Sequence, residues 1–331
     1  MSKEQTFMGG WKSNLRYDPI PLLGSSSNEA IRFHVSRDIL DEPLEQVNHL
    51  WEMKQAKKML NKQQEDGSWR YPNPKLEIRS LKGYNQVETF RILAILIEKY
   101  LLNREHPAIE KVAEFLFGCQ TKEGDFRGIY WNQYTPNYSA SFMELLIKAG
   151  YQDDKRIKLG LDWLLSIRQD DGGWLIPFRT ANLRLNEAMA RPDPVQPDRS
   201  KPFSHMATGV VLRAFAAHPK YHERPEVQKV GELLASRIFK ADRYADRKSP
   251  EFWTRFSFPF WFTDLLSTLD TLSKLGLSVE QPQIREGIDW FIEHQKKDGL
   301  WKLKLVRGTS DKSQNLWVNQ VICRTLKRLL T

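Results

Sequence analysis

One short motif, repeated along the chain, constrains the fold more than any other feature of the sequence. A glutamine is followed by acidic or polar residues, a glycine and an aromatic residue. The readable copies are Gln64–Trp69, Gln120–Phe126, Gln169–Trp174 and Gln295–Trp301. Each copy ends a segment with helical periodicity and precedes a more apolar one. A motif that recurs in one structural context is a scaffold element, so the pattern predicts a repeat of paired helices.

Two kinds of helix are expected to alternate. The first kind is amphipathic and should keep one face in solvent, as the stripe Ile157, Leu161 and Leu164 indicates. The second kind is apolar around most of its circumference and should be buried. Amphipathic helices are expected at about 47–63, 107–119, 154–168, 225–239 and 281–294, and buried helices at about 28–40, 84–101, 137–149, 204–217, 259–275 and 314–330. With no convincing strand pattern, the sequence predicts an all-α fold.

The spacing of the copies favours one continuous domain. The interval between Gln169 and Gln295 leaves room for two repeats, and the other intervals leave room for one. We expect residues 1–27 to form an N-terminal arm packed on the body and residues 28–331 to form a single domain, with Asn28 among the caps of its first helix. The proline-rich loop 175–203 is long for a compact repeat, so it is expected to be a lid or a rim.

The residue types of the motif explain its recurrence. Glycine supplies the positive φ that ends a helix. Glutamine brings an amide long enough to satisfy carbonyls of its own or the next helix. The aromatic residue covers that amide and packs into the neighbouring repeat. A structural role is therefore expected for Gln64, Trp69, Gln120, Gln169, Trp174, Gln295 and Trp301.

The net charge of the protein gives only weak information about its partners. The 331 residues include 50 basic and 41 acidic ones, a formal net charge of +9. Such a charge favours anionic partners. Because the two signs are interleaved and no block resembles a nucleic-acid-binding arm, no nucleic-acid partner is expected and solubility is the simpler explanation.

The cysteines and the apolar segments of the sequence indicate in which cellular compartment the protein is expected. Cys119 and Cys323 are isolated thiols, which favour a reducing environment over a disulfide framework. The first residues lead into no apolar run of signal-peptide length, and the run 92–97 is too short to span a bilayer. We expect a cytoplasmic protein, with peripheral membrane contact compatible with the sequence.

The repeated motif resembles the QW repeat of squalene and oxidosqualene cyclases, which is related to the toroid of protein prenyltransferase β-subunits. The resemblance covers about residues 28–331. It implies an (α/α)6-type toroid, with inner helices around a central cavity and outer helices surrounding them. The segments 31–40, 258–266 and 317–321 also look like single-toroid bacterial proteins that are labelled prenyltransferase or squalene-cyclase repeat proteins.

The sequence departs from those families at their reactive motifs. The Asp-x-Asp-Asp motif, whose middle aspartate protonates the substrate in squalene-hopene-type cyclases, is absent, and Asp153-Asp154 and Asp170-Asp171 occur in turns. The magnesium-binding Asp-Asp-x-x-Asp pattern is also missing. Neither cysteine has an aspartate two residues before it, as the zinc site of protein prenyltransferases requires. No metal and no cofactor are therefore expected.

A toroid would gather the first turns of its inner helices at one mouth of the cavity. Helix N-termini present unpaired N–H groups and suit an anionic head group, and aromatic walls could hold an apolar chain. The alternative is ordinary helix capping. In chain order these starts hold Asn28 and Arg32, Tyr84 and Asn85, Asn137 and Tyr138, Ser204 and His205, Trp261 and Asp264, and Asn315 and Trp317.

Two groups are candidates for catalysis. Asp264 lies beside Trp261, and a carboxyl group that faces an apolar cavity would have a raised pKa and could donate a proton. Alternatively it bonds helix N–H groups or pairs with Arg255, which would lower its pKa. His34 and Asp38 form a cluster with Arg37 that is either an acid–base pair beside an anion anchor or a salt-bridged helix face. Candidate substrate-binding residues are Arg32, Arg37, Tyr84, Asn85, Trp131, Tyr138, His205, Arg255, Trp261 and Trp317.

Three functions follow as hypotheses. The first is a toroid that binds an isoprenoid or similar lipid, with acid-initiated cyclisation as the reaction it could catalyse. The second is a non-enzymatic module that binds a partner. The third is a carbohydrate-active α/α barrel, which would need two carboxylates at a spacing used in glycosidic chemistry.

Overall fold

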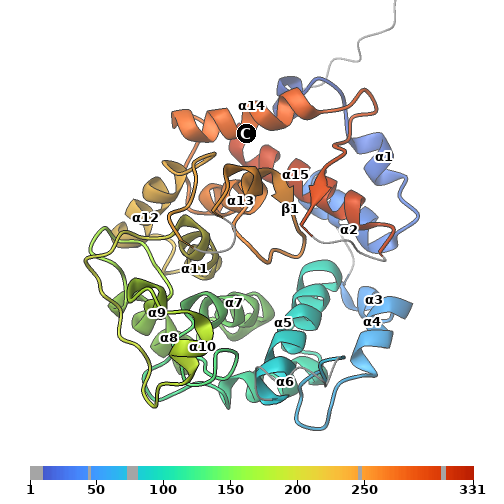
Figure 1. Cartoon of the computed structure of the whole chain (residues 1–331). Helices are drawn as coiled ribbons and strands as arrows, with labels where there is room; N and C mark the ends of the chain where they lie inside the picture. The colour runs from blue at the N-terminus through green and yellow to red at the C-terminus, as the bar shows by residue number, and fades with distance from the viewer. Residues whose placement is uncertain (1–9, 44–45, 73–80, 245–247, 307–310) are drawn as a thin grey trace, which may run out of the picture. The chain divides into compact units, whose positions relative to one another are not determined.

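The architecture comes from a computed structural model, which describes residues 10–43, 46–72, 81–244, 248–306 and 311–331. Apart from turns and loops, the described part of the chain is mostly helical (Figure 1). Two strands of two residues each, β1 (Arg255–Phe256) and β2 (Lys304–Leu305), form one short parallel pair in this part of the chain. The predicted all-α class is confirmed.

The two kinds of helix alternate as predicted. The buried helices are α2 (Glu29–Asp38), α5 (Leu81–Tyr100), α7 (Pro136–Leu146), α11 (His205–Ala217), α13 (Leu265–Lys274) and α15 (Gln314–Leu330). The amphipathic helices are α3 (Asn48–Trp51) with α4 (Lys54–Leu60), α6 (Pro107–Phe117), α8 (Lys155–Ser166), α12 (Pro225–Ala235) and α14 (Pro282–His294). This is the helix order expected of an α/α repeat. Shorter helical segments are η1 (Gly10–Asn14), α1 (Ile20–Gly24), η2 (Ile147–Tyr151), α9 (Pro177–Thr180), α10 (Leu185–Met189) and η3 (Pro250–Thr254).

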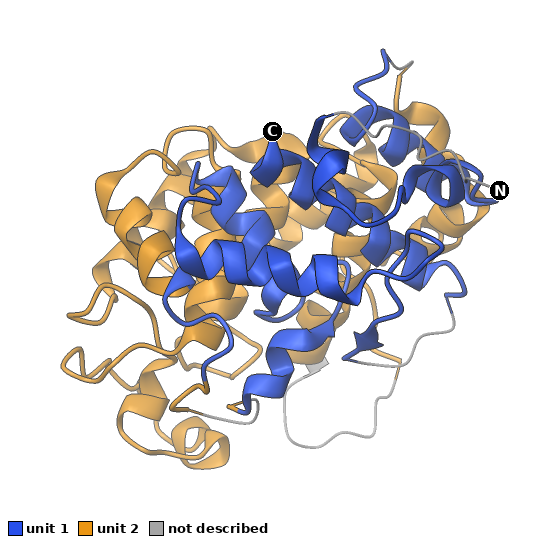
Figure 2. Cartoon of the chain, turned by 90° about the horizontal axis from the view of Figure 1, so that it is seen from above, with its two compact units in different colours: residues 1–45, 235–240, 249–331 blue, residues 46–234, 241–248 orange. Residues whose placement is uncertain are grey.

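The chain separates into two compact units (Figure 2). Unit 1 comprises residues 1–45, 235–240 and 249–331, and unit 2 comprises residues 46–234 and 241–248. Unit 1 contains α2, α13 and α15 together with the N-terminal segment. Unit 2 contains α5, α7 and α11, of which α7 packs against both α5 and α11. None of the helices described is long and apolar enough to cross a membrane.

Helix starts follow local capping chemistry. The Asn28 side chain accepts a hydrogen bond from the Ala30 N–H, as expected of a cap. The largest error in helix bounds is α13, which begins at Leu265 instead of near residue 259. Its N-cap is Asp264, and Asp264 and Ser267 form a reciprocal capping box that fixes the helix start there.

The repeated turn joins neighbouring repeats through its glutamine amide. Gln120 Nε2 donates to the carbonyls of Gly124 in its own turn and Arg156 in the first turn of α8, at 2.8 Å each. In the first copy the same bonds come from Gln63, which reaches Gly67 and Ala108. Gln64, the residue that the sequence pattern selects, donates only to the carbonyl of Lys62. The expected structural role at this turn therefore belongs to Gln63.

The aromatic residue of the turn connects the two helices of one pair. The indole Nε1 of Trp69, Trp174 and Trp301 donates to a carbonyl of the preceding amphipathic helix, in Met59, Leu164 and Phe291 respectively. The backbone N–H of each motif aromatic donates to a polar side chain of the following buried helix. These acceptors are Thr89, Ser139, Thr208 and Asn319. The motif thus fastens amphipathic and buried helices together.

The loop 175–203 belongs to unit 2 and is tied down along its length. Gln169 donates to the carbonyls of Asp198 and Lys201 instead of to a following helix. Gln133 donates to the Ala188 carbonyl and accepts from the Val195 N–H. Side chains outside the loop therefore hold it in place, and the glutamine of the third motif copy is one of them.

Candidate functional site

The first turns of α5 and α7 carry an aromatic surface in unit 2. The rings of Tyr71 and Tyr84 lie 4.9 Å apart, and Asn85 Oδ1 accepts the Tyr71 N–H at 3.0 Å. Tyr84, Asn85 and Tyr71 are all partly exposed. Asn85 therefore positions the segment that follows the first repeated turn, and Tyr84 adds a ring at the surface beside it.

A second ring cluster lies at the start of α7. The Tyr130 ring lies 5.7 Å from Tyr138 and 5.9 Å from Phe178, which comes from the 175–203 loop. Gln86 on α5 donates to the Arg127 carbonyl at 2.7 Å, so the first turns of α5 hold the loop that carries Tyr130. We call Tyr71, Tyr84, Tyr130, Trp131, Tyr138 and Phe178 the aromatic rim.

Trp131 is the most unusual member of the rim. Its side chain is 54% exposed, the largest exposure among the large apolar residues described. Its backbone has φ of 58°, in the left-handed region that bulky residues avoid. Gly128 and Trp131 exchange backbone hydrogen bonds of 3.1 and 3.2 Å, which close a tight turn and hold this conformation. Strained backbone that presents an exposed indole is a feature more typical of binding sites than of scaffolds.

Three buried polar atoms near the rim lack hydrogen-bond partners among the described residues. They are Oε1 of Gln86, Oδ1 of Asn137 and Nε of Arg179. Gln86 and Asn137 lie in the first turns of α5 and α7, and Arg179 follows Phe178 in α9. The sequence pointed to Tyr84, Asn85, Trp131 and Tyr138 here, and the structure brings all four to this end of α5 and α7. It gave no signal for Gln86 or Arg179.

His205 does not join this open surface. The side chain is 4% exposed, and its Nδ1 lies 3.4 Å from Oδ2 of Asp242. The same carboxylate accepts from Ser204 Oγ at 2.8 Å and from the Met206 N–H at 2.9 Å. Asp242 therefore closes the N-terminus of α11, because its negative charge satisfies the N–H groups and positive dipole end that an anionic ligand would use.

In unit 1 the candidate site residues at the helix starts either cap a helix or belong to the hydrophobic core. Asp264 is buried, and its Oδ1 accepts the Ser267 N–H at 2.7 Å. Trp317 is fully buried against Phe258, with ring centroids 6.1 Å apart. The sequence left three roles open for Asp264: proton donor, helix cap and ion-pair partner of Arg255. The hydrogen bond to the Ser267 N–H is that of a helix cap.

The other unit 1 candidates also have local contacts. Arg32 donates to the Ser26 carbonyl. Arg255, in β1, pairs with Glu251 at 3.1 Å and lies over the Phe252 ring. Arg255 is therefore not the partner of Asp264 in any described ion pair. Trp261 is partly exposed, its backbone N–H donates to Ser257 Oγ at 3.3 Å, and its ring is tilted by 60° from that of Phe262.

His34, Arg37 and Asp38 form the cluster expected from their spacing. Asp38 lies 3.2 Å from His34 Nδ1 and 2.6 Å from Arg37 Nε. Burial would raise the pKa of Asp38, but hydrogen bonds from His34 and Arg37 and the charge of Arg324 outweigh it and lower that pKa. Burial lowers the pKa of His34. The cluster thus holds a firmly ionised aspartate and favours a neutral histidine.

Unit 1 holds a second buried carboxylate, that of Asp270. Asp270 on α13 pairs with Lys274 at 2.7 Å and with Arg324 and Arg328 on α15. Burial would raise its pKa, but the charges of these three cations lower it well below its usual value. Because Arg324 also approaches Asp38, one network joins α2, α13 and α15. It is a structural network of ionised groups.

Unit 2 has a comparable network that the sequence did not reveal. Glu144 on α7 pairs with Lys148 at 2.6 Å and with Arg213 on α11 at 2.9 Å, and Lys148 also pairs with Glu98 on α5. Burial would raise the pKa of Glu144, but Arg213 and Lys148 lower it to about 2. A single arginine within the apolar run of α11 was the available signal, because a buried cation needs a partner. Among the described residues no three His, Cys, Asp or Glu side chains are grouped to hold a metal.

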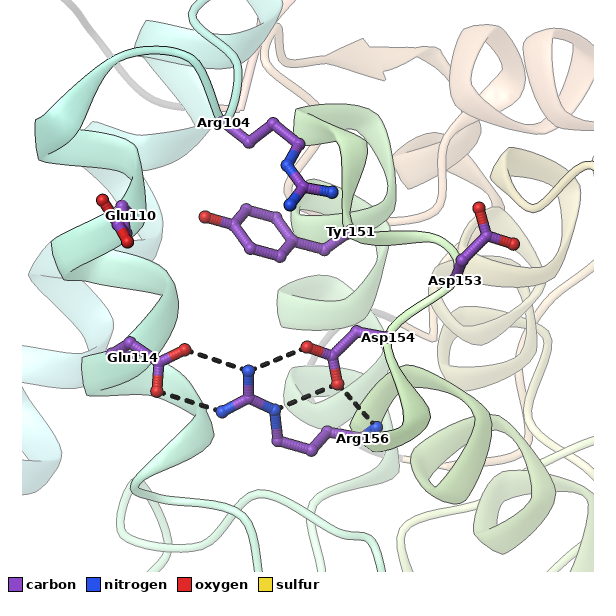
Figure 3. Close-up of a pocket in the computed structure, with 7 residues that line it drawn as sticks. All are labelled: Arg104, Glu110, Glu114, Tyr151, Asp153, Asp154 and Arg156. Atoms are coloured by element: carbon purple, nitrogen blue, oxygen red, sulfur yellow. Dashed lines mark hydrogen bonds and ion pairs between the residues drawn. The ribbon is translucent and has the colours of Figure 1, made fainter.

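A charged pocket lies at the other end of α7 (Figure 3). It has a volume of about 480 Å³ and is lined by Arg104, Glu110, Glu114, Tyr151, Asp153, Asp154 and Arg156. Arg156 reaches between Glu114 and Asp154 with four hydrogen bonds of 2.8–3.0 Å. Arg104 donates to the Gly150 carbonyl and lies over the Tyr151 ring. Since Arg156 is committed to joining α6 to α8, this pocket is first of all a junction between repeats.

Comparison with known proteins gives similarity to solved structures alone. No protein-family model matches the sequence, and no curated protein matches it either. A polysaccharide lyase is 13% identical over 89% of this chain and 86% of its own, with a TM-score of 0.46. A variant of the type II terpene cyclase MstE from Scytonema, with its substrate geranylgeranyl dihydroxybenzoate, is 13% identical over 84% of this chain and 68% of its own, with a TM-score of 0.34. Such values carry no inference about what this protein binds.

Proposed function

We propose that the protein binds an isoprenoid or similar apolar ligand at the aromatic rim of unit 2. The observation that carries the proposal is Trp131, a large apolar side chain kept in solvent by a left-handed backbone. A left-handed backbone at a bulky residue costs on the order of 1–3 kcal/mol. The fold does not recover this cost by burying the indole, which suggests that the exposed indole has a role in binding. The rings of Tyr130 and Tyr138 extend the apolar surface beside it.

The buried acids favour binding over acid-initiated chemistry. An acid that starts a cyclisation must be protonated near neutral pH, which requires a raised pKa. Asp38, Asp270 and Glu144 have lowered pKa values because cations surround them. Asp264 is engaged as a helix cap. We therefore assign ligand binding to the protein, with no reaction at these carboxyl groups.

Calorimetric titration with farnesol and geranylgeraniol tests the proposal. We expect Trp131→Ala to weaken binding about tenfold, equivalent to about 1.4 kcal/mol, because an indole contributes much of the energy of a small apolar contact. Leu159→Ala is the matched control, since Leu159 is also an exposed apolar residue, on α8. Its binding should be unchanged.

Two results would overturn the assignment. The first is a failure of the isoprenoid expectation, seen either as no isoprenoid binding or as isoprenoid binding that both variants leave unaffected. The second is Trp131-dependent binding of a soluble oligosaccharide such as maltohexaose in place of the isoprenoids. Sugar rings also stack on exposed indoles, so this second outcome would favour the carbohydrate hypothesis.

A further inference from the structure

The rim has polar atoms whose chemistry specifies the polar end of its ligand. Gln86 is fully buried, and its orientation is fixed because Nε2 donates to the Arg127 carbonyl at 2.7 Å. Its Oε1 must therefore be the acceptor without a partner among the described residues. Asn137 Oδ1 is a second buried acceptor without a partner among the described residues, and Arg179 Nε is a buried donor without one. An unmet buried polar group costs about 1–3 kcal/mol, so a ligand that satisfies these atoms gains affinity.

Resting on the proposed function, we propose that the ligand ends in a neutral hydroxyl group that donates to Gln86 Oε1 at the rim. A hydroxyl both donates and accepts, so its single hydrogen satisfies Gln86 Oε1 while its oxygen stays available to a donor. A diphosphate only accepts, so its oxygens cannot donate to the amide oxygen of Gln86. The neighbouring cation Arg127 offers little help, because Asp125 and Glu123 already pair with it at 2.8 and 2.7 Å.

The turn with Trp131 covers the buried amide. A Cβ added to Gly128 would lie 2.5 Å from Gln86 Oε1, so the glycine backbone rests directly on this atom. The two hydrogen bonds between Gly128 and Trp131 lie within the turn. A ligand hydroxyl can therefore reach Gln86 Oε1 only when this turn moves aside, because the Gly128 backbone covers that atom.

The test compares three ligands with the same isoprenoid chain: farnesol, farnesyl methyl ether and farnesyl diphosphate. The ether keeps the oxygen as an acceptor but has no donor. We expect farnesol to bind at least about tenfold more tightly than either, because a hydrogen bond to an otherwise unmet buried acceptor is worth about 1–3 kcal/mol. In Gln86→Met, which also loses the bond to the Arg127 carbonyl, farnesol and the ether should bind equally.

The outcomes separate this inference from the proposed function. If the ether or the diphosphate binds as tightly as farnesol, the hydroxyl assignment is wrong while binding at the rim stands. If none of the three binds, the proposed function has failed and this inference with it. Preference for farnesol that survives in Gln86→Met would also refute the role of Gln86. Should that variant unfold, the comparison of the three ligands on the wild-type protein still decides whether the ligand needs a hydroxyl donor.

Discussion

Two neighbouring glutamines give a direct test of how the repeats are joined. Gln63 Nε2 donates to the carbonyls of Gly67 and Ala108 at 3.0 and 2.8 Å, and so connects the first turn to the start of α6. Gln64 Nε2 makes one bond, at 3.1 Å, to the carbonyl of Lys62 at the surface. Both side chains are partly exposed, so the pair differs mainly in these contacts.

The expected magnitudes follow from the bonds that each variant removes. A net contribution of about 0.5–1.5 kcal/mol per hydrogen bond gives a loss of roughly 1–3 kcal/mol for Gln63→Ala. For Gln64→Ala we expect a loss below about 0.5 kcal/mol, as for most surface substitutions. Turn propensities add little to the difference, because both variants place alanine next to the same turn.

Urea unfolding and amide hydrogen exchange would measure both effects. We expect Gln63→Ala to lower the unfolding midpoint and to speed exchange in the first turns of α6, with the denaturant slope unchanged. Equal stability losses in the two variants, or a larger loss for Gln64→Ala, would refute the assignment of the bridging role to Gln63. That result would mean that the sequence pattern had identified the residue correctly.

Two further predictions concern the buried carboxylates. The pKa of Glu144 is lowered to about 2 from an ordinary 4.5, so its ion pairs stabilise the fold above pH 4.5, and this stability is lost as the pH falls toward 2. The free energy of unfolding should therefore fall less steeply over that pH range in Glu144→Gln than in the wild-type protein. Identical slopes would contradict the pairing. Asp264→Ala should cost about 1 kcal/mol in urea unfolding and Asp264→Asn less than half of that, because asparagine also caps helices; equal losses would argue against a capping role.

Local chemistry made much of the fold predictable. The cap at Asn28 and the apolar stripe of α8 depend on residues close in sequence, so their periodicity and spacing were sufficient. Alternation of amphipathic and buried helices was predictable for the same reason. The His34–Asp38 contact also followed from i, i+4 spacing on one helix face.

The candidate site was predictable only in part. Tyr84 and Tyr138 were found because helix starts can be placed from sequence. Asp242 closes α11 from 37 residues after His205, and no local pattern specifies that contact. Nor does a local pattern show whether Gln86 has a partner for each of its amide atoms, since this depends on which backbone packs against it.

By itself the sequence determined the succession of helices and the residues that end them, because periodicity and turn chemistry act over a few residues. The tertiary structure decided which polar and charged side chains find hydrogen-bond or ion-pair partners. Gln63 and not Gln64 joins the first two repeats, and Glu144 meets Arg213 on another helix, since both outcomes depend on packing between distant segments. The physical reason is that hydrogen bonds and ion pairs of buried groups are set by neighbours in space.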